Sequence, residues 1–355
     1  MVEESLNCQY NKCSFAQDYL MMGKAVLLDL LTGIFTVQMC LRINKKAVIY
    51  MEYESDILNV AVINFKPKHG DKESNLRRIK DFTVASAKRG ADIILFPEMC
   101  LTGYDFYDDK DTDREKKLSL AETIPGPSTL SLAEITRKYE VYVVYGMPQK
   151  HDSLPEVLYN SAAVIGPNGI VGAYKKIHPY GSENNWCVKG DAPFMFDTKW
   201  GPISIGICYD TYHFPELMRY YASNGSRLYL NPTAIINEVT QESSSTGSGS
   251  SSGFKEGYVP FLTYGVLSNH LFIASSNLVG YDNKTFFGGG SLIVGPKITP
   301  SGATYCTSYA GDVDCNQEGV FIATIDLSLA TRSIIQNNPL TGVPDYRKDL
   351  YGTFK

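Results

Sequence analysis

The sequence predicts an α/β layered fold, because strand-like and helix-like segments alternate along most of the chain. Short apolar runs typical of buried strands are separated by longer segments with one apolar face. A content of 44% hydrophobic residues supplies enough material for a layered core and argues against a disordered chain. The 355 residues exceed one average domain, but α/β architectures often use such a length in a single unit.

The elements follow from local patterns, taken in chain order. Residues 57–65 predict the first strand because they form a nearly continuous apolar run. Residues 71–89 predict a helix, since Leu76 and Ile79 share one face and Gly90 can end it. The same patterns predict strands over residues 91–96, 141–147, 158–165, 170–175, 202–207, 227–231 and 271–274, and helices over residues 214–223 and 258–269.

Three of these strands end at residues capable of catalysis. Glu98 follows Pro97, which cannot donate to a sheet ladder and so marks a strand end. Lys176 and Cys208 each follow an apolar strand directly. Open α/β sheets place their active sites at the carboxyl ends of strands. Taken singly, each residue also has an ordinary explanation, as a surface carboxylate, a solvated strand end and a core cysteine.

Together, the three strand ends resemble the Glu–Lys–Cys triad of the nitrilase superfamily of carbon–nitrogen hydrolases. The segments that carry the resemblance are Phe96-Pro97-Glu98, Tyr174-Lys175-Lys176-Ile177-His178 and Gly206-Ile207-Cys208-Tyr209-Asp210. Supporting motifs follow in family order: Leu101-Thr102-Gly103-Tyr104, Glu183 with Trp186, Phe214-Pro215-Glu216-Leu217, Asn231-Pro232-Thr233-Ala234, Phe287-Gly288-Gly289-Gly290-Ser291 and Arg347-Lys348-Asp349-Leu350-Tyr351. The resemblance spans roughly residue 56 to the C-terminus. It implies a four-layer α-β-β-α sandwich, which commonly pairs into a homodimer or a higher homo-oligomer.

The resemblance also implies a role for each residue. Amide hydrolysis through a thioester needs a nucleophile, a proton carrier and a stabiliser of the oxyanion. Cys208 would be the nucleophile, and Glu98 the general base and then the acid. Lys176 and the backbone N–H of Tyr209 would donate to the oxyanion, and the lysine would also lower the pKa of the thiol. Glu183 would position the substrate amide and hold the lysine.

The substrate is less clear from the sequence. Tyr209-Asp210 favours an amide, because nitrile-cleaving relatives tend to carry Trp-Glu there. His213 stands where omega-amidase-like relatives have an arginine, and it is either a substrate-facing group or an ordinary loop histidine. Ser268 replaces a carboxylate of the relatives. The predicted pocket residues are Tyr104, His213 and Asn231.

Four alternative functions remain at this point. A nitrilase and an N-carbamoyl amidohydrolase would share the predicted site and differ in their products. A catalytically idle binding module on the same fold would have no need of Glu98, Lys176 and Cys208 together. A papain-like cysteine protease would require a histidine base, and no such signature accompanies the cysteine.

Composition excludes several classes of partner and cofactor. The net charge is −5 and no basic stripe appears, so nucleic acid is not an expected partner. The basic run Lys66-Pro67-Lys68-His69 is short and predicts a solvated loop. None of the eight cysteines forms a C-x-x-C pair and the five histidines are scattered, so we expect no metal and no cofactor. No convincing secretion signal is present, which favours a reducing, cytoplasmic location.

Two segments fall outside the resemblance. Residues 1–55 form an N-terminal extension of unknown role, either a leader, a segment packed on the catalytic domain, or a partner-binding or membrane-surface helix. Lys24 and Asp29 interrupt its most apolar part, so we expect no membrane-spanning helix. Within the predicted hydrolase domain, residues 56–355, a Ser/Gly-rich insertion covers residues 242–253. It is either a flexible lid or a tolerated insertion.

Overall fold

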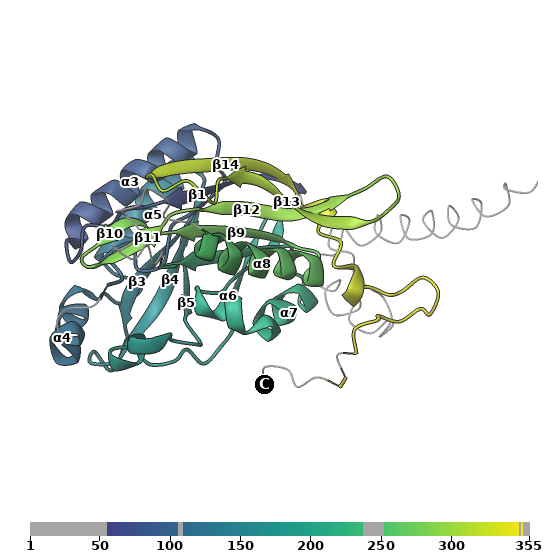
Figure 1. Ribbon diagram of the computed structural model, residues 1–355. Helices are drawn as coiled ribbons and strands as arrows, with labels where there is room; N and C mark the ends of the chain where they lie inside the picture. The colour runs from purple at the N-terminus through teal and green to yellow at the C-terminus, as the bar shows by residue number, and fades with distance from the viewer. Residues whose placement is uncertain (1–54, 106–108, 237–251, 348, 351–355) are drawn as a thin grey trace, which may run out of the picture. The chain divides into compact units, whose positions relative to one another are not determined.

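Two six-stranded sheets face each other in the computed structural model, which describes residues 55–105, 109–236, 252–347 and 349–350 (Figure 1). The first sheet has the order β14 (Gly319–Asp326), β1 (Ile57–Asn64), β2 (Ile93–Leu95), β3 (Tyr142–Lys150), β4 (Leu158–Gly166) and β5 (Gly169–Lys175). The second has the order β13 (Thr304–Gly311), β12 (Leu292–Ile298), β9 (Phe272–Asn277), β8 (Leu228–Thr233), β7 (Gly201–Ile205) and β6 (Met195–Thr198). A separate hairpin joins β10 (Val279–Asp282) to β11 (Thr285–Gly288).

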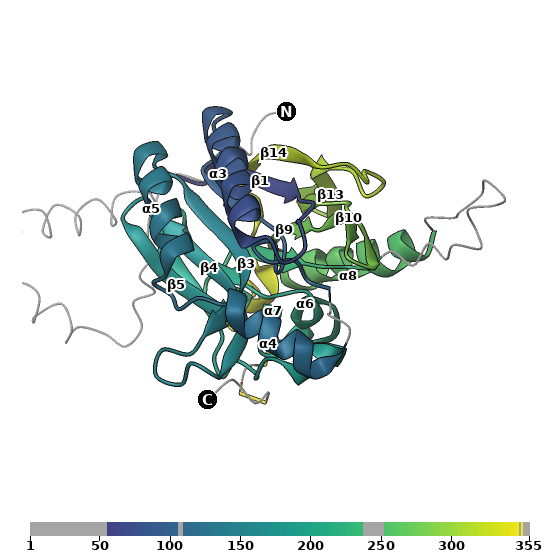
Figure 2. The same ribbon diagram turned by 90° about the vertical axis from the view of Figure 1, so that its left-hand side faces the viewer.

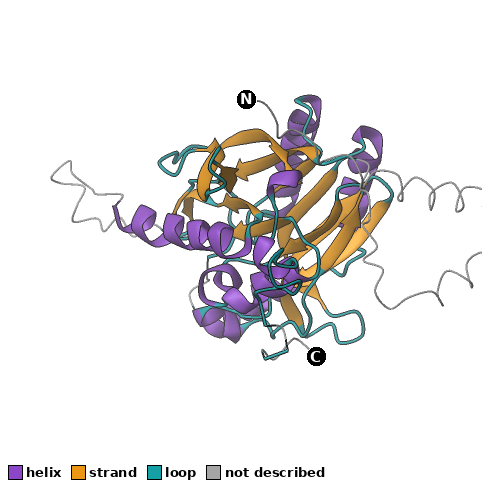
Figure 3. Ribbon diagram, turned by 90° about the vertical axis from the view of Figure 1, so that its right-hand side faces the viewer, coloured by secondary structure: helices purple, strands orange, loops and turns teal. Residues whose placement is uncertain are grey.

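Helices cover the outer face of each sheet. Helices α3 (Lys72–Lys88) and α5 (Pro127–Tyr139) lie side by side on the first sheet (Figure 2). Helices α6 (Tyr209–His213), α7 (Pro215–Ser223) and α8 (Ser252–Asn269) lie on the other side of the strands (Figure 3). Within the described ranges, the remaining helices are α4 (Lys110–Leu120) and three 3₁₀ turns, η3 (Gly181–Asn185), η5 (Leu327–Leu329) and η6 (Ser333–Ile335). The predicted α-β-β-α sandwich is confirmed.

The period of two along the strands explains this layering. In β1, Leu58, Val60 and Val62 belong to the apolar core between the sheets. The intervening Ala61 and Ile63 belong to a second apolar core beneath α3 and α5. Successive side chains of a strand point to opposite faces, so a continuous apolar run is buried on both sides.

Strand direction brings the predicted site residues to one edge. Strands β1, β2 and β3 are parallel, and β7, β8 and β9 are parallel in the other sheet. Strand β5 runs antiparallel to β4, which is itself antiparallel to β3, so β5 has the direction of β2. Glu98 and Lys176 therefore leave the first sheet at the same edge.

Two element boundaries were predicted wrongly. The predicted helix 214–223 is α7, but a further helix, α6, already begins at Tyr209, directly after the cysteine. The helix expected from residue 258 begins at Ser252 and takes in the last two residues of the predicted insertion. Residues 1–54 and the greater part of the insertion lie outside the described residues. No helix in the described part of the chain is long and apolar enough to cross a membrane.

Candidate active site

Glu98 is a fully buried carboxylate whose two oxygens have different surroundings. Its Oε1 accepts hydrogen bonds from Nδ2 of Asn160 and Nζ of Lys176, both at 2.7 Å. Its Oε2 is buried and has no hydrogen-bond partner among the described residues. Burial raises the pKa of Glu98, Lys176 opposes this effect and the charge of Glu183 supports it, and together they bring that pKa to about 7. The group can therefore exchange a proton at neutral pH.

The loop that carries Glu98 lies directly on the backbone of β3. The backbone N–H of Gly146 donates to the carbonyl of Pro97 at 3.1 Å, and the N–H of Leu101 donates to the carbonyl of Gly146 at 3.2 Å. A Cβ atom on the glycine would lie 2.2 Å from the backbone nitrogen of Met99. Only glycine permits this approach, so β3 sets the height of Glu98 above the sheet.

Lys176 is a buried ammonium held between two carboxylates. Its Nζ donates to Oε1 of Glu98 at 2.7 Å and to Oε1 of Glu183 at 2.8 Å. Its backbone N–H donates to the carbonyl of Asn160 at 2.8 Å, which fixes the end of β5. Burial by itself would lower the pKa of Lys176, but the two carboxylates outweigh it and hold that pKa well above its ordinary value. The lysine is therefore a permanent cation.

Glu183 receives four hydrogen bonds from the surrounding structure. It lies on the 3₁₀ turn η3 and is 1% exposed. Besides the lysine, its Oε1 accepts from the hydroxyl of Tyr104 at 2.6 Å. Its Oε2 accepts from the N–H of Tyr180 at 3.2 Å and from Nδ2 of Asn160 at 3.3 Å. The predicted pocket residue Tyr104 is thus buried, and its hydroxyl points to this carboxylate.

Cys208 occupies a strained turn between β7 and α6. Its φ of +46° and ψ of −102° are rare for a residue with a side chain. Its backbone N–H donates to the carbonyl of Pro232 at 3.0 Å and to Oδ1 of Asn231 at 3.2 Å, which holds the turn in place. Tyr209 begins α6, and N–H groups in a helix's first turn have no carbonyl partner within the helix.

The thiol of Cys208 lies within electrostatic reach of both charged groups. Burial raises its pKa to about 12, the charge of Glu98 adds to this effect, and Lys176 lowers the pKa only in part. The predicted influence of the lysine on the thiol is therefore present but outweighed. At neutral pH the thiol is protonated, so a base has to remove its proton before it can attack a carbon.

Asn231, predicted for the substrate pocket, is buried and has a full set of hydrogen bonds. Its Oδ1 accepts from the N–H of Cys208 and from Oγ1 of Thr211, the latter at 2.8 Å. Its Nδ2 donates to the hydroxyl of Tyr212 at 2.7 Å and to Oγ of Ser275 at 2.9 Å. In this structure its amide ties the cysteine turn to α6 and β9.

Asp210 joins the two sheets behind the site, a role that the sequence did not reveal. Its Oδ1 accepts from the N–H of His178 at 3.0 Å and lies 2.7 Å from Nδ1 of the same histidine. Its Oδ2 accepts from the N–H of Ile207 at 3.0 Å and from the hydroxyl of Tyr174 at 2.8 Å. The carboxylate thereby fixes the cysteine turn relative to the end of β5.

Asn160 is a second residue that sequence reasoning missed. It is fully buried in the middle of an apolar strand and bridges the carboxylates of Glu98 and Glu183. A buried polar residue needs hydrogen-bond partners, so an asparagine inside an apolar strand was the available signal. The sequence could not identify those partners, because they follow other strands.

His213, by contrast, is exposed at the end of α6. Its ring lies 4.6 Å from that of Tyr209 and 5.8 Å from that of Phe261 on α8. The histidine is therefore part of an aromatic surface beside the site rather than of the buried cluster.

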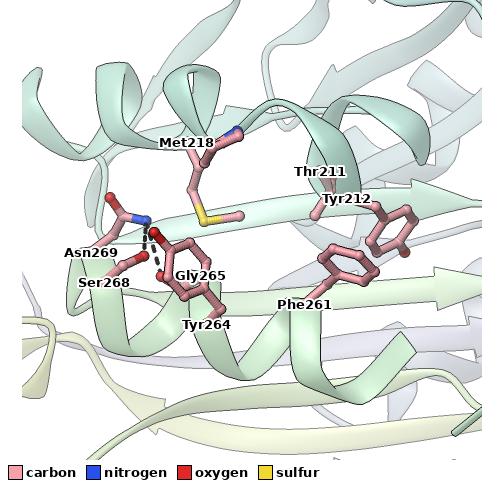
Figure 4. Close-up of a pocket in the computed structure, with 9 residues that line it drawn as sticks. Thr211, Tyr212, Met218, Phe261, Tyr264, Gly265, Ser268 and Asn269 are labelled. Carbon is pink, nitrogen blue, oxygen red and sulfur yellow. Dashed lines mark hydrogen bonds between the residues drawn. The ribbon is translucent and has the colours of Figure 1, made fainter. Parts of the chain in front are cut away.

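A pocket of about 140 Å³ lies between α8 and the pair α6–α7 (Figure 4). Its lining includes Tyr212, Phe261 and Ser268, while Cys208 does not line it. The ring of Tyr212 borders the pocket, and its hydroxyl bonds to Asn231 on the side of the thiol. The described residues contain no group of three or more histidine, cysteine or acidic side chains arranged to hold a metal ion.

The chain is similar in sequence and in fold to known proteins. The family model of carbon–nitrogen hydrolases matches residues 59–334. A probable nitrilase of Schizosaccharomyces pombe is 28% identical over 299 residues, covering 82% of this chain and 97% of that protein. An omega-amidase of Homo sapiens is 32% identical over 174 residues, covering 46% of this chain and 59% of that protein. An amidase of the nitrilase superfamily from Nesterenkonia sp. AN1 has the same fold, with a TM-score of 0.60, 22% identity, and coverage of 84% and 97% of the two chains.

Proposed function

Because the chain belongs to the carbon–nitrogen hydrolases of the nitrilase superfamily, enzymes that act on non-peptide bonds, we propose that it hydrolyses a small-molecule amide to a carboxylic acid and ammonia. The proposal rests above all on Glu98. Its Oε2 is buried and has no hydrogen-bond partner among the described residues, while its other oxygen is bound to the ammonium of Lys176. A base with one oxygen available, a fixed cation and a nearby thiol are what amide cleavage through a thioester requires.

In the first half of the reaction, Glu98 removes the proton of the Cys208 thiol as the sulfur attacks the amide carbon. The carbonyl electrons move to the oxygen, and the ammonium of Lys176 and the backbone N–H of Tyr209 donate to the resulting oxyanion. When the tetrahedral intermediate collapses, the carbon–nitrogen bond breaks and Glu98 returns its proton to the nitrogen. Ammonia leaves, and a thioester remains on the cysteine.

In the second half, a water molecule replaces ammonia beside Glu98. The carboxylate removes a proton from the water while the water oxygen attacks the thioester carbon. The ammonium of Lys176 and the backbone N–H of Tyr209 again donate to the oxyanion. The carbon–sulfur bond then breaks, and the thiolate of Cys208 recovers the proton from Glu98. The net reaction consumes one amide and one water and gives one carboxylic acid and one ammonia.

A nitrilase is the second candidate, since the relative from Schizosaccharomyces pombe that matches over 97% of its length is called a probable nitrilase. Nitrile hydrolysis would use the same thiol and base. The Tyr209-Asp210 pair after the cysteine resembles amidases instead, which favours the amide. An N-carbamoyl substrate would release carbon dioxide together with ammonia.

The test is ammonia release from a panel of short amides, nitriles and carbamoyl amines. We expect turnover of at least one amide and none of the nitriles, with carbon dioxide absent from the products. The Cys208→Ala variant should lose this activity, because no other group can form the thioester. Cys315→Ala removes a different, partly exposed cysteine and serves as the matched control. Amide hydrolysis at the wild-type rate in Cys208→Ala would refute the mechanism.

We also propose that the chain acts as a homodimer or a higher homo-oligomer, as the family resemblance implies, and that it is cytoplasmic. Sedimentation of the intact protein tests the first point, since one chain has a mass of 39.4 kDa. Fractionation of cells that express the full chain tests the second.

A further inference from the structure

The backbone of Gly103, Tyr104 and Asp105 is held from both sides by buried charges. Oδ2 of Asp282 accepts hydrogen bonds from the N–H of Tyr104 at 2.6 Å and of Asp105 at 2.9 Å. The ammonium of Lys117, on α4, donates to the carbonyls of all three residues, at 3.4, 3.2 and 3.0 Å. The backbone of this segment is thus fixed through its N–H groups and through its carbonyl oxygens.

The contact between this segment and the β10–β11 hairpin is reciprocal. Asp282 lies on the hairpin and binds the segment, while Oδ2 of Asp105 accepts from the hairpin N–H groups of Lys284 at 2.7 Å and Thr285 at 2.9 Å. Nδ1 of His69 lies 2.8 Å from Oδ1 of Asp282. His69 therefore lies in a loop, as predicted, but its side chain is only 16% exposed and is bound to Asp282. The two carboxylates and their backbone partners form what we call the Asp282–Asp105 clamp.

A glycine makes the clamp possible. Gly103 has a φ of +85°, a conformation that residues with side chains rarely adopt. A Cβ atom at this position would lie 2.7 Å from Oδ1 of Asp282 and 3.0 Å from Nδ1 of His69. The carboxylate of Asp282 can reach the backbone only because this space is empty.

Tyr104 connects the Asp282–Asp105 clamp to the candidate active site. Its ring packs edge-on against Phe287 of β11, with the ring centroids 5.9 Å apart. Its hydroxyl donates to Oε1 of Glu183 at 2.6 Å, and the same oxygen accepts from Nζ of Lys176 at 2.8 Å. A tyrosine has only two side-chain torsions, so fixing its backbone and its ring also fixes its hydroxyl.

We infer that Asp282 is a positioning residue that sets the Lys176 ammonium through Tyr104 and Glu183. The inference rests on the proposed function, in which Lys176 binds the oxyanion. Loss of the clamp frees the Tyr104 backbone, withdraws the hydroxyl from Glu183 and lets that carboxylate draw the ammonium away from the reacting carbonyl. A displacement of about 1 Å at a catalytic group can lower a rate by about 10²-fold.

The test is a double-mutant cycle with Asp282→Ala and Tyr104→Phe in the full chain, because an asparagine at position 282 would keep an oxygen that can accept from the same N–H groups. Each single variant should lower kcat about tenfold and change KM less than about twofold, because the ammonium acts on the oxyanion rather than on the bound substrate. The double variant should be no slower than the slower single variant, since both changes break one chain of contacts. Asp152→Ala, on an exposed loop, is the matched control. Additive losses, or an unchanged kcat in Asp282→Ala, would overturn the inference.

A second measurement does not depend on turnover. The rate at which iodoacetamide alkylates Cys208, followed by mass spectrometry of its peptide, reports how Glu98 and Lys176 are placed against the thiol. Both variants should shift the pH dependence of this rate in the same direction, and identical profiles in wild type and variants would overturn the inference. A wild type inactive on every amide would refute the proposed function while leaving this measurement valid. If Asp282→Ala does not fold, Asp105→Ala, which releases the other half of the clamp, takes its place in both measurements.

Discussion

At the scale of single residues, the two oxygens of the Glu98 carboxylate have different roles in the proposed site. Oε1 of Glu98 is occupied by Lys176 and Asn160, so it fixes the geometry of the cluster. Oε2 has no hydrogen-bond partner among the described residues and is the position at which a proton can arrive and leave. The proton can therefore be exchanged without moving the cation, which we expect to keep the oxyanion donors in place throughout a reaction cycle.

The first prediction concerns pH. Burial raises the pKa of Glu98 to about 7, and the proposed base is active only when it is ionised. Below that pH the protonated carboxyl cannot accept the thiol proton, so kcat/KM for an amide should fall about tenfold per pH unit. Above it the rate should level off. A pH profile at constant ionic strength measures this, and a rate that stays level down to pH 5 would exclude Glu98 as the base.

The second prediction separates the two partners of the Lys176–Glu183 pair. Lys176→Met removes a proposed oxyanion donor and should lower kcat by about 10²–10³-fold. Glu183→Gln keeps an oxygen that can accept from the lysine and from Tyr104, so the fall in kcat should be smaller in this variant. Steady-state kinetics of both variants beside Asp152→Asn measures the difference. Equal losses in the two variants would mean that Glu183 does more than hold the lysine.

At the scale of elements, the close contact between β3 and the loop after β2 fixes Glu98, the proposed base. Gly146 lies in the middle of β3, and its N–H and carbonyl both bond to the loop that carries Glu98. The thiol of Cys100, in the same loop, adds a third hydrogen bond to this contact by donating to the Gly146 carbonyl at 3.6 Å. The strand thereby supports the carboxylate that we propose as the base.

The third prediction follows from this contact. In Gly146→Ala the added methyl group would overlap the backbone of the Glu98 loop, so the loop has to move. We expect a loss of about 1–3 kcal/mol in the free energy of unfolding and at least a tenfold fall in kcat. Gly319→Ala on β14 is the matched control, because no atom lies within 4 Å of its added Cβ. Unchanged activity in Gly146→Ala would mean that the loop position does not matter.

The same scale explains what the sequence could predict. Strand ends are local features, so an apolar run that stops at Pro97 was enough to locate Glu98. Helix α6 was missed because its five residues show no apolar periodicity. The contact between Tyr104 and Asp282 joins residues 178 positions apart, and only the folded hairpin brings them together. The strand-end positions of the proposed catalytic residues were thus predictable, whereas the groups that hold them were not.

At the scale of the whole molecule, the two sheets share one interior. The apolar core between them takes side chains from β1, β2, β3 and β4 on one side and from β7, β8 and β9 on the other. Strand β14, late in the chain, pairs along the full length of β1, the first strand described. Nε1 of Trp200, before β7, donates to the carbonyl of Ile57 at 2.8 Å and so ties the second sheet to the first. Neither sheet could keep its inner face buried without the other.

The fourth prediction is that the described sandwich unfolds in one transition. The chain has only two tryptophans: Trp200 lies in the core between the sheets, and Trp186 in the core beneath the outer helices, beside Glu183. In Trp186→Phe and in Trp200→Phe the remaining tryptophan reports one of these two cores. Because both cores share the strands of the first sheet, fluorescence and circular dichroism should give the same urea midpoint in each variant. A Trp186 signal that changes at lower urea than the circular dichroism would show that the edge beside Glu183 opens on its own, and the prediction of a single transition would then be wrong.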